Sequence, residues 1–449
     1  MTKHTLLAAM LASLFAMTQH AVGAVTAEEA AKLKTTLTPL GGERAGNKDG
    51  SIPAWDGGLT NMPAVKMGPT LPGDLFANEK PVVQINAANM AQYADKLSEG
   101  VQALLKKYPT YRVDVYPTHR TASAPQYIYD NTFKNATRAN LAKNGMSVEG
   151  AYGGVPFPIP KSGIEIFWNH TLRPQATSYE FAFKNLVGTA DGRRVLASQN
   201  NNNFQYPYYF QNGSVEKWDG VFHTLRFITN APPFKAGESL VCRDNIDPGQ
   251  GRACWQYLVG QRRVRRAPTV GYDTPDFVAS GANYFDEAFG FWGGPDRYEW
   301  KLAGKKEIYI PYNENRFFNT TENEAFVPHH TNPDKVRWEL HRVWVVEATL
   351  ASGKRHAVPK RRFYFDEDTY SVALIDGFDA EGKLWRTSQV FPWNLPSYPL
   401  VVNYQSFIYN LQADTYSCVM CLNDGYWRAV QTKPDSFFTG EALGSESNR

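Results

Sequence analysis

The four cysteines are the residues whose type and spacing most directly suggest chemistry. An even number of cysteines in an exported chain suggests disulfides, and four cysteines allow three pairings. Cys242 and Cys254 flank a turn-rich segment, as a cross-bridge on a hairpin would. Cys418 and Cys421 form a C-x-x-C, a redox spacing in a thioredoxin-like context, but no βαβ pattern surrounds them. We therefore predict two local structural disulfides, Cys242–Cys254 and Cys418–Cys421.

The other candidate nucleophiles and ligands form no recognisable catalytic motif. The sequence contains no G-x-S-x-G, no H-E-x-x-H and no G-x-x-x-x-G-K-[ST]. His329 and His330 are adjacent, so on a strand they would point to opposite faces. Asp366-Glu367-Asp368 is interpreted as a turn, because the loop is too short for an EF-hand. The sequence thus predicts no metal, no cofactor and no enzymatic activity.

A basic cluster leaves two interpretations open. Arg262, Arg263, Arg265 and Arg266 form either a solvated strand end or a surface for anionic headgroups or an acidic partner. Over the whole chain, 47 Lys and Arg residues against 44 Asp and Glu residues give a formal charge of +3. This near balance predicts no nucleic acid partner.

The N-terminus has the pattern of a cleaved export signal. Lys3 precedes an apolar run from Leu6 to Met17, and Val22 and Ala24 suit cleavage after Ala24. The run is shorter than the roughly 20 apolar residues of a membrane-spanning helix. We predict a signal peptide at 1–24 and one large mature domain at 25–449. No Cys follows the cut, so the mature protein is not expected to be a lipoprotein.

Helices and long loops are expected in the first part of the mature chain, residues 25–160. Apolar residues at three- and four-residue steps predict an amphipathic helix from Asn89 to Tyr108, ended by Pro109. A second helix is predicted at 126–143. Between the helices lie segments rich in Gly and Pro. The first helix is expected to cover the sheet with Met90, Leu97, Val101 and Leu104.

Alternating strands dominate the second part, residues 161–449, from about Ile164 onward. Trp338–Leu350, Lys354–Phe365, Tyr370–Phe378 and Lys383–Phe391 are joined by short turns, which predicts an antiparallel meander. We predict a mainly β, α+β fold in which one face of the sheet is aromatic and the other is wet. The residues expected to line a ligand cavity on the aromatic face are Trp338, Leu340, Arg342, Trp344, Val346, Phe363 and Phe365.

Arg342 is the one charged member of that predicted face. A buried guanidinium cannot stay unpaired, because burying an isolated charge is very costly. Either the alternation breaks and Arg342 reaches solvent, or it pairs with a structural carboxylate. In a third interpretation it lies at the cavity mouth, where it holds the cover closed through backbone carbonyls or binds a polar cargo headgroup.

Three segments resemble a known periplasmic family, domain of unknown function 1329. They are Leu37–Gly58, with Leu-Thr-Pro-Leu-Gly-Gly-Glu-Arg-Ala-Gly-Asn-Lys-Asp-Gly-Ser-Ile-Pro-Ala-Trp; Phe76–Ala122, with Tyr-Pro-Thr-His-Arg-Thr; and Gly304–Phe317. The resemblance covers nearly the whole mature chain. It implies a fold similar to the lipoprotein carriers LolA and LolB, an incomplete, curved antiparallel barrel with helices on its concave apolar face. It also implies a transport setting beside an outer-membrane β-barrel and an inner-membrane exporter.

The leading functional hypothesis is a periplasmic carrier or chaperone for a lipid or another hydrophobic molecule. A 16-carbon chain left in water costs about 12 kcal/mol, so it cannot cross the periplasm quickly without an apolar container. The alternative is an adaptor that bridges an exporter and an outer-membrane partner and holds no cargo. An enzyme acting on a hydrophobic substrate is a third hypothesis, disfavoured by the absent motifs.

Overall fold

The computed structural model describes residues 24–60, 73–395 and 398–447. The predicted signal peptide, except Ala24, therefore lies outside the described residues. Strands and helices confirm the predicted α+β class, with strands predominating. Within the described ranges, no helix is both long enough and apolar enough to cross a bilayer.

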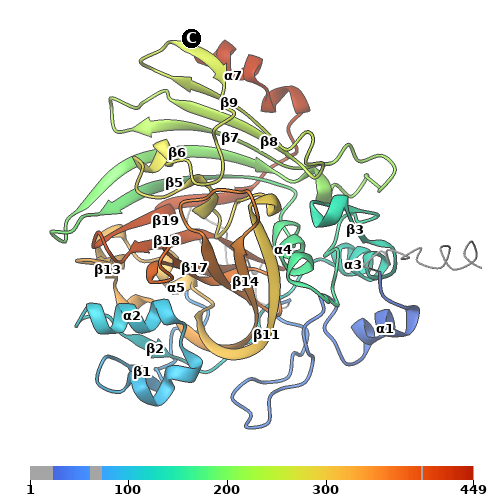
Figure 1. Cartoon of the computed structure of the whole chain (residues 1–449), viewed down its shortest axis with the longest axis vertical. Helices are drawn as coiled ribbons and strands as arrows, with labels where there is room; N and C mark the ends of the chain where they lie inside the picture. The colour runs from blue at the N-terminus through green and yellow to red at the C-terminus, as the bar shows by residue number, and fades with distance from the viewer. Residues whose placement is uncertain (1–23, 61–72, 396–397, 448–449) are drawn as a thin grey trace, which may run out of the picture.

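One large open sheet dominates the molecule, and it is built from two antiparallel limbs (Figure 1). Strand β19 pairs with β5 and joins the limbs, so the last strand of the second limb lies beside the first strand of the first limb. The first limb is β5 Ser178–Gly188, β6 Arg194–Gln205, β7 Val221–Ala231, β8 Ser239–Asn245, β9 Arg252–Leu258 and β10 Arg263–Arg266. The second limb is β14 Trp338–Leu350, β15 Lys360–Asp366, β16 Val372–Phe378, β17 Leu384–Leu395, β18 Leu400–Asn410 and β19 Thr415–Ala429.

Shorter elements extend and cover this sheet. Strand β11, Tyr298–Pro311, pairs with β14 along most of its length. The remaining strands are β1 Val83–Ile85, β2 Val113–Val115, β3 Asn140–Ala142, β4 Ser147–Glu149, β12 Phe326–Val327 and β13 His330–Thr331. The α-helices are α1 Ala27–Ala31, α2 Glu99–Lys107, α3 Gln126–Arg138, α4 Gly163–Thr171, α5 Asn315–Phe318, α6 Glu322–Ala325 and α7 Gly440–Ser447.

The helix predicted over Asn89–Tyr108 is divided into two. A 3₁₀ helix, η2, spans Met90–Lys96, Leu97 is extended, and α2 begins after Ser98. The division follows from Ser98, whose side chain accepts a hydrogen bond from the backbone N–H of Val101 and so caps a new helix. The four residues expected to face the sheet, Met90, Leu97, Val101 and Leu104, are all buried.

Helix α4 corrects the prediction that strands begin at Ile164. Ser162 accepts a hydrogen bond from the backbone N–H of Glu165, and the Glu165 side chain accepts one from the N–H of Lys161. This Ser-x-x-Glu arrangement starts a helix, and it is visible in the sequence. The strands of the first limb begin instead at Ser178.

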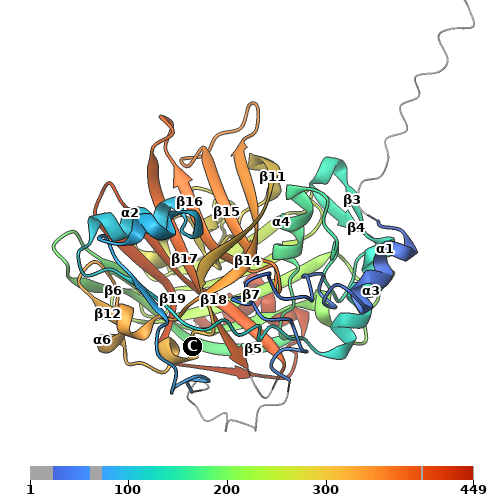
Figure 2. The ribbon, with the colours of Figure 1, turned by 90° about the horizontal axis from the view of Figure 1, so that it is seen from below.

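Both faces of the second limb are buried, so the prediction of a wet face is wrong. Trp344 pairs with Phe365, and Val346 with Phe363, which places these side chains on one face. Helix α2 covers the other face, where the N–H of Gly100 donates to Asp376 at 3.0 Å. Helix α2, the second half of the predicted cover helix, and the predicted cavity residues therefore lie on opposite faces. Figure 2 shows α2 and α4 to either side of the sheet.

The aromatic face is covered by α4 and by an irregular segment of the chain itself, residues 267–297, here called the plug. Its regular structure is limited to short 3₁₀ turns, η5 Phe277–Ala279, η6 Phe285–Glu287 and η7 Pro295–Arg297. Phe291 of the plug lies 5.1 Å from Phe363, and Phe289 lies 5.1 Å from Phe204, measured between ring centroids. The plug thus contacts both limbs of the sheet.

Candidate ligand cavity and buried ionic cluster

The plug is fixed to the second limb by two buried ion pairs. Asp286 accepts hydrogen bonds of 2.8 and 3.0 Å from Arg361 and one of 2.8 Å from His356. Glu287 accepts bonds of 2.6 and 2.7 Å from Arg386. Burial alone would raise the pKa of Asp286, but the charges of Arg361 and His356 outweigh it and hold that pKa below its usual value.

A cavity of about 400 Å³ lies where the plug meets α4 and the β8–β9 turn. This volume falls within the roughly 300–1,000 Å³ of typical small-molecule sites. The apolar part of its lining comes from Met146, Phe167, Trp168, Phe222, Ile246 and Val270. Asp244, Arg252 and Asp296 add charged groups to the lining. The lining of the cavity therefore combines apolar and charged side chains.

The charged part of the lining is held in place by Asp244. Its carboxylate accepts hydrogen bonds from Arg252 at 2.6 Å, from Trp292 at 2.9 Å and from His223 at 3.1 Å. The Arg252 guanidinium also lies 3.5 Å from the centroid of the Trp292 ring. Burial opposes ionisation of Asp244, but the charge of Arg252 and the bond from His223 lower its pKa to about 2. Asp244 is therefore a fixed negative charge.

A second, smaller cavity of about 40 Å³ lies between the plug and the first limb. Most of its lining is apolar, from Phe183, Phe204, Leu225, Phe227 and Leu240. Asn202 also lines it, and neither side-chain polar atom of this buried residue has a hydrogen-bond partner among the described residues. Trp292 lines this cavity while its hydrogen-bond partner Asp244 lines the larger one, so the two spaces lie close together.

The residues predicted to form a ligand cavity line neither of these spaces. Trp338, Leu340, Val346, Phe363 and Phe365 are buried in the hydrophobic core, and Trp344 is half-buried against it. The strand pattern identified their shared face, but it could not show that the plug and α4 fill the space above it. The cavities lie instead at the edges of the plug, whose residues carry no periodic pattern.

Arg342 pairs with structural carboxylates, one of the interpretations left open by the sequence. Its Nη1 donates a 3.0 Å hydrogen bond to the carbonyl of Ala45. Carboxylate oxygens of Glu43, Glu307 and Glu367 each lie 3.8 Å from its guanidinium nitrogens. Arg342 thus fixes the N-terminal segment against β14.

Both predicted disulfide pairings are present. Cys242 and Cys254 are directly opposite on β8 and β9. Cys418 and Cys421 lie on either side of a β-bulge in β19, where Met420 has a left-handed φ of 58°. All four cysteines are buried, which agrees with structural roles.

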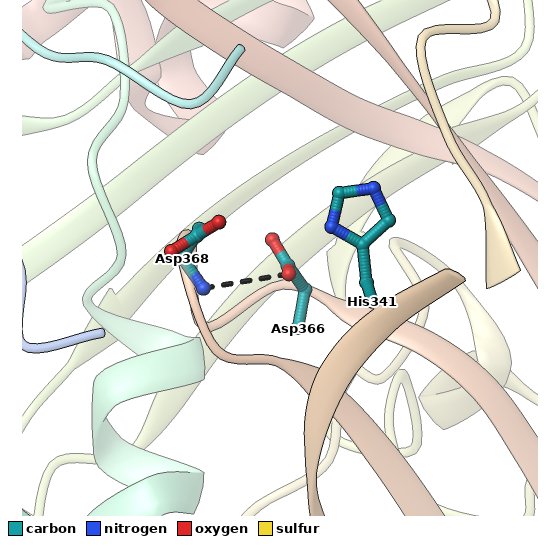
Figure 3. A group of neighbouring side chains, drawn as sticks. All are labelled: His341, Asp366 and Asp368. Carbon is teal, nitrogen blue, oxygen red and sulfur yellow. Dashed lines mark hydrogen bonds between the residues drawn. The ribbon is translucent and has the colours of Figure 1, made fainter. Parts of the chain in front are cut away.

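A compact ionic cluster, absent from the sequence predictions, lies inside the second limb (Figure 3). It contains His341 of β14 and Asp366 and Asp368 at the β15–β16 turn, all buried. One potential ligand atom from each residue lies within 4.8 Å of the other two. Arg120 donates hydrogen bonds of 2.8 and 2.6 Å to Asp368. Burial, reinforced by the charge of Asp368, raises the pKa of Asp366 to about 6.

Outer contacts orient His341. Its Nε2 lies 3.0 Å from the Glu339 carboxylate, which also accepts hydrogen bonds from Arg337 at 2.5 Å and from Asn313 at 2.9 Å. The Tyr312 ring stacks on the imidazole with centroids 3.8 Å apart. In Figure 3 the other ring nitrogen, Nδ1, points to the side on which the two aspartates lie.

The three segments that carry the family resemblance meet around this cluster. The carbonyl of Glu43, in the first segment, accepts a 2.7 Å hydrogen bond from Arg120 in the second. Asn313, in the third, donates to the carbonyl of His119 in the second at 3.2 Å. Segments far apart in the chain thus build one buried site.

The sequence contained a signal for this cluster. The strands predicted at Trp338–Leu350 and Lys354–Phe365 form a hairpin, in which the end of the second strand lies beside the first half of the first strand. In the structure Val343 pairs with Asp366. His341 is two residues from Val343 on the same face, so counting the register from the turn would have brought His341 to the aspartates. The cluster was missed because this face of the sheet was predicted to be exposed to solvent.

These observations define a class of protein: an open antiparallel sheet of two limbs, with its aromatic face filled by an irregular segment of its own chain and a cavity beside that segment. The chain belongs to the family described as "Protein of unknown function (DUF1329)", which matches residues 84–444. Uncharacterized protein PA3922 of Pseudomonas aeruginosa is 42% identical over 377 residues, covering 82% of each chain. The family resemblance is thereby confirmed.

Two solved structures of related description match part of the chain with low TM-scores. A DUF1329 family protein from Desulfovibrio piger matches with a TM-score of 0.43 and 12% identity, covering 63% of this chain and 97% of that one. The LolA superfamily protein NE2245 from Nitrosomonas europaea matches with a TM-score of 0.36 and 11% identity, covering 63% of this chain and 100% of that one.

Proposed function

We propose that this protein is an exported, periplasmic carrier for a lipid or another hydrophobic molecule that has a polar end. The observation that carries the proposal is the cavity of about 400 Å³, whose lining combines apolar side chains with the charged residues Asp244, Arg252 and Asp296. An acyl or polycyclic body would lie against Phe167, Trp168 and Val270. Its polar end would meet Arg252, whose charge is already oriented by Asp244.

A movement within the plug would let such a carrier bind a longer cargo molecule. Trp292 is half-buried and lines the small apolar cavity, which lies close to the large one. Rotation of its ring would join the two spaces and bring cargo to the aromatic side chains of the first limb. Each buried CH₂ group contributes about 0.8 kcal/mol, so extra length in this direction favours binding.

The second candidate is an adaptor without cargo, bridging an inner-membrane exporter and an outer-membrane β-barrel. The residues predicted to line a cavity on the second limb are packed against other side chains and line neither of the two cavities. This packing favours an adaptor that holds no cargo. The exposed arginines Arg263, Arg265 and Arg266 on the edge strand β10 would suit an acidic partner. The two candidates differ in whether the large cavity binds anything.

A cavity-filling variant tests the carrier proposal. A Cβ atom built on Gly271, in the lining of the large cavity, meets only the Arg252 guanidinium, at an ordinary 3.6 Å. Gly271→Trp should therefore fold and occupy the cavity. The matched control is Gly260→Trp, at an exposed glycine with no atom within 4 Å of the added Cβ.

The measurement is displacement of a fluorescent fatty-acid probe, together with native mass spectrometry of protein purified from the periplasm. The carrier proposal expects wild type and Gly260→Trp to bind alike and Gly271→Trp to bind at least about tenfold more weakly, a difference of about 1.4 kcal/mol. Equal probe binding by all three proteins, with no co-purified lipid, would leave the adaptor as the better candidate.

A further inference from the structure

We propose that His341, Asp366 and Asp368 form a binding site for one divalent transition-metal ion, with Zn²⁺ as the best fit. The proposal is independent of the carrier function, because the cluster lies apart from the residues of both cavities. The three side chains come from a strand and from a turn 25 to 27 residues further along the chain. A metal ion would tie the β15–β16 turn to the middle of β14.

The donor set suits this class of ion. One imidazole nitrogen and two carboxylate oxygens are ligands that Zn²⁺ and Mn²⁺ accept, whereas Ca²⁺ takes six to eight oxygen ligands. The ligand atoms lie within 4.8 Å of one another. A tetrahedral zinc site with bonds of about 2.0–2.1 Å sets its ligand atoms roughly 3.4 Å apart. Small side-chain rotations would therefore close the cluster around the ion.

The surroundings of His341 support the proposal independently of the ligand spacing. Histidines that bind metals through one ring nitrogen almost always donate the other N–H to a carboxylate or a carbonyl. His341 has this arrangement, since its Nε2 lies 3.0 Å from Glu339 while its Nδ1 side faces the aspartates. Glu339 is itself held by Arg337 and Asn313, so the imidazole cannot easily turn away.

Local charge also favours a divalent cation. Four carboxylates, of Asp366, Asp368, Glu339 and Glu79, are linked in this region to only two guanidinium groups, of Arg120 and Arg337. Counting the carboxylates and guanidinium groups alone, two negative charges are in excess in a largely buried site. A divalent ion would neutralise both, and uncompensated buried charge is costly.

A small void next to Asp366 has room for about one water molecule, although His341 and Asp368 do not line it. It has a volume of about 10 Å³ and is lined by Tyr312, Asp366, Thr369 and Asn403 among others. That is close to the minimum space for one water molecule. The Nδ2 of Asn403, a buried residue, has no hydrogen-bond partner within the described part of the chain. A water there could contact both Asn403 and Asp366.

Metal analysis of the exported full-length protein tests the site directly. Elemental mass spectrometry should find about one equivalent of a first-row transition metal in wild type. His341→Gln and Asp366→Asn should lose it. His119→Gln is the matched control, because His119 is a half-buried histidine paired with Glu79 on the outer side of the same network, and this variant should keep the metal.

A second measurement keeps the test decisive if the ligand variants fail to fold. Wild type is unfolded with a chelator, refolded without metal, and its melting temperature is recorded with and without added Zn²⁺. The proposal expects Zn²⁺ to raise the melting temperature, because an ion that binds only the folded state stabilises it. Metal-free wild type whose melting temperature does not respond to Zn²⁺ would overturn the proposal and leave His341 as a hydrogen-bonding partner of Glu339 alone.

Discussion

Arg361 on β15 donates two hydrogen bonds, of 2.8 and 3.0 Å, to Asp286 of the plug, and both residues are buried. The plug meets the first limb differently, through aromatic contacts such as Phe289 with Phe204. Two buried ion pairs thus fix one side of the plug, whereas its other side is held by aromatic packing and by single hydrogen bonds such as that from Trp292 to Asp244. Any opening of the aromatic face is therefore expected on the first-limb side.

Removal of Arg361 should strongly destabilise the fold. Arg361→Met leaves Asp286 buried with His356 as its remaining side-chain partner. Loss of one partner of a buried pair costs about 3–5 kcal/mol. Lys383→Met is the matched control, since Lys383 and Glu381 form an exposed pair worth at most about 1 kcal/mol. Urea unfolding of the three proteins gives both values, and equal stability of the two variants would contradict the role assigned to Asp286.

Gly100 should resist replacement although it lies inside a helix. Alanine normally stabilises a helix relative to glycine by about 1 kcal/mol. A Cβ at Gly100 would lie 1.9 Å from Thr387 Oγ1 and 2.3 Å from Asp376 Oδ1, so α2 would have to move off the sheet. Gly100→Ala should lower the melting temperature, whereas Lys106→Ala, at an exposed position of the same helix, should leave it nearly unchanged. A more stable Gly100→Ala protein would show that α2 is not closely packed there.

The sequence predicted the regular elements better than the site. Alternation identified β14 and its neighbours because a strand repeats every two residues. The even cysteine count in a chain with a predicted export signal, with a turn between Cys242 and Cys254, led to the correct disulfide pairing. The plug has no such period, because its conformation depends on contacts with both limbs. Its anchors, Asp286 and Glu287, pair with arginines about 75 and 99 positions away in the sequence, and no local pattern encodes such pairs.

Arg342 should act on the N-terminal segment and not on cargo. Arg342→Leu removes the bond to the Ala45 carbonyl and leaves Glu367 with Lys305 as its remaining basic partner. We expect a loss of about 1–3 kcal/mol in unfolding free energy and easier proteolysis near Ala45, with unchanged affinity for the fatty-acid probe. Arg342→Lys should restore only part of the stability, because lysine lacks the planar fork of donors. Weaker probe binding by Arg342→Leu at full stability would return this residue to the binding site.

Asp276 should make the plug more stable in acid. Its side chain is buried beside the small apolar cavity, accepts a 2.9 Å hydrogen bond from the N–H of Val278 and contacts Asn283 at 3.2 Å. Burial raises the pKa of Asp276 from 3.8 to about 6, against smaller opposing effects of these bonds and of Lys235. A raised folded-state pKa means that the folded protein holds the proton more tightly than the unfolded chain. The stabilisation is therefore complete below about pH 4 and is lost as the pH rises through 6.

Asp276→Asn isolates this effect, because asparagine stays neutral and keeps a carbonyl oxygen to accept the bond from Val278. The difference in unfolding free energy between variant and wild type should grow in favour of the variant by about 2 kcal/mol between pH 4 and pH 7. Asp379→Asn is the control of opposite sign: the backbone N–H of Lys383 lowers the pKa of Asp379, so this variant should lose relative stability as the pH rises. Urea unfolding from pH 4 to pH 7 measures the first difference, and the second is measured by extending the series below pH 4, where Asp379 takes up its proton. A constant difference for Asp276→Asn would mean that burial does not raise the pKa of Asp276 and that this carboxyl group does not make the stability of the plug depend on pH.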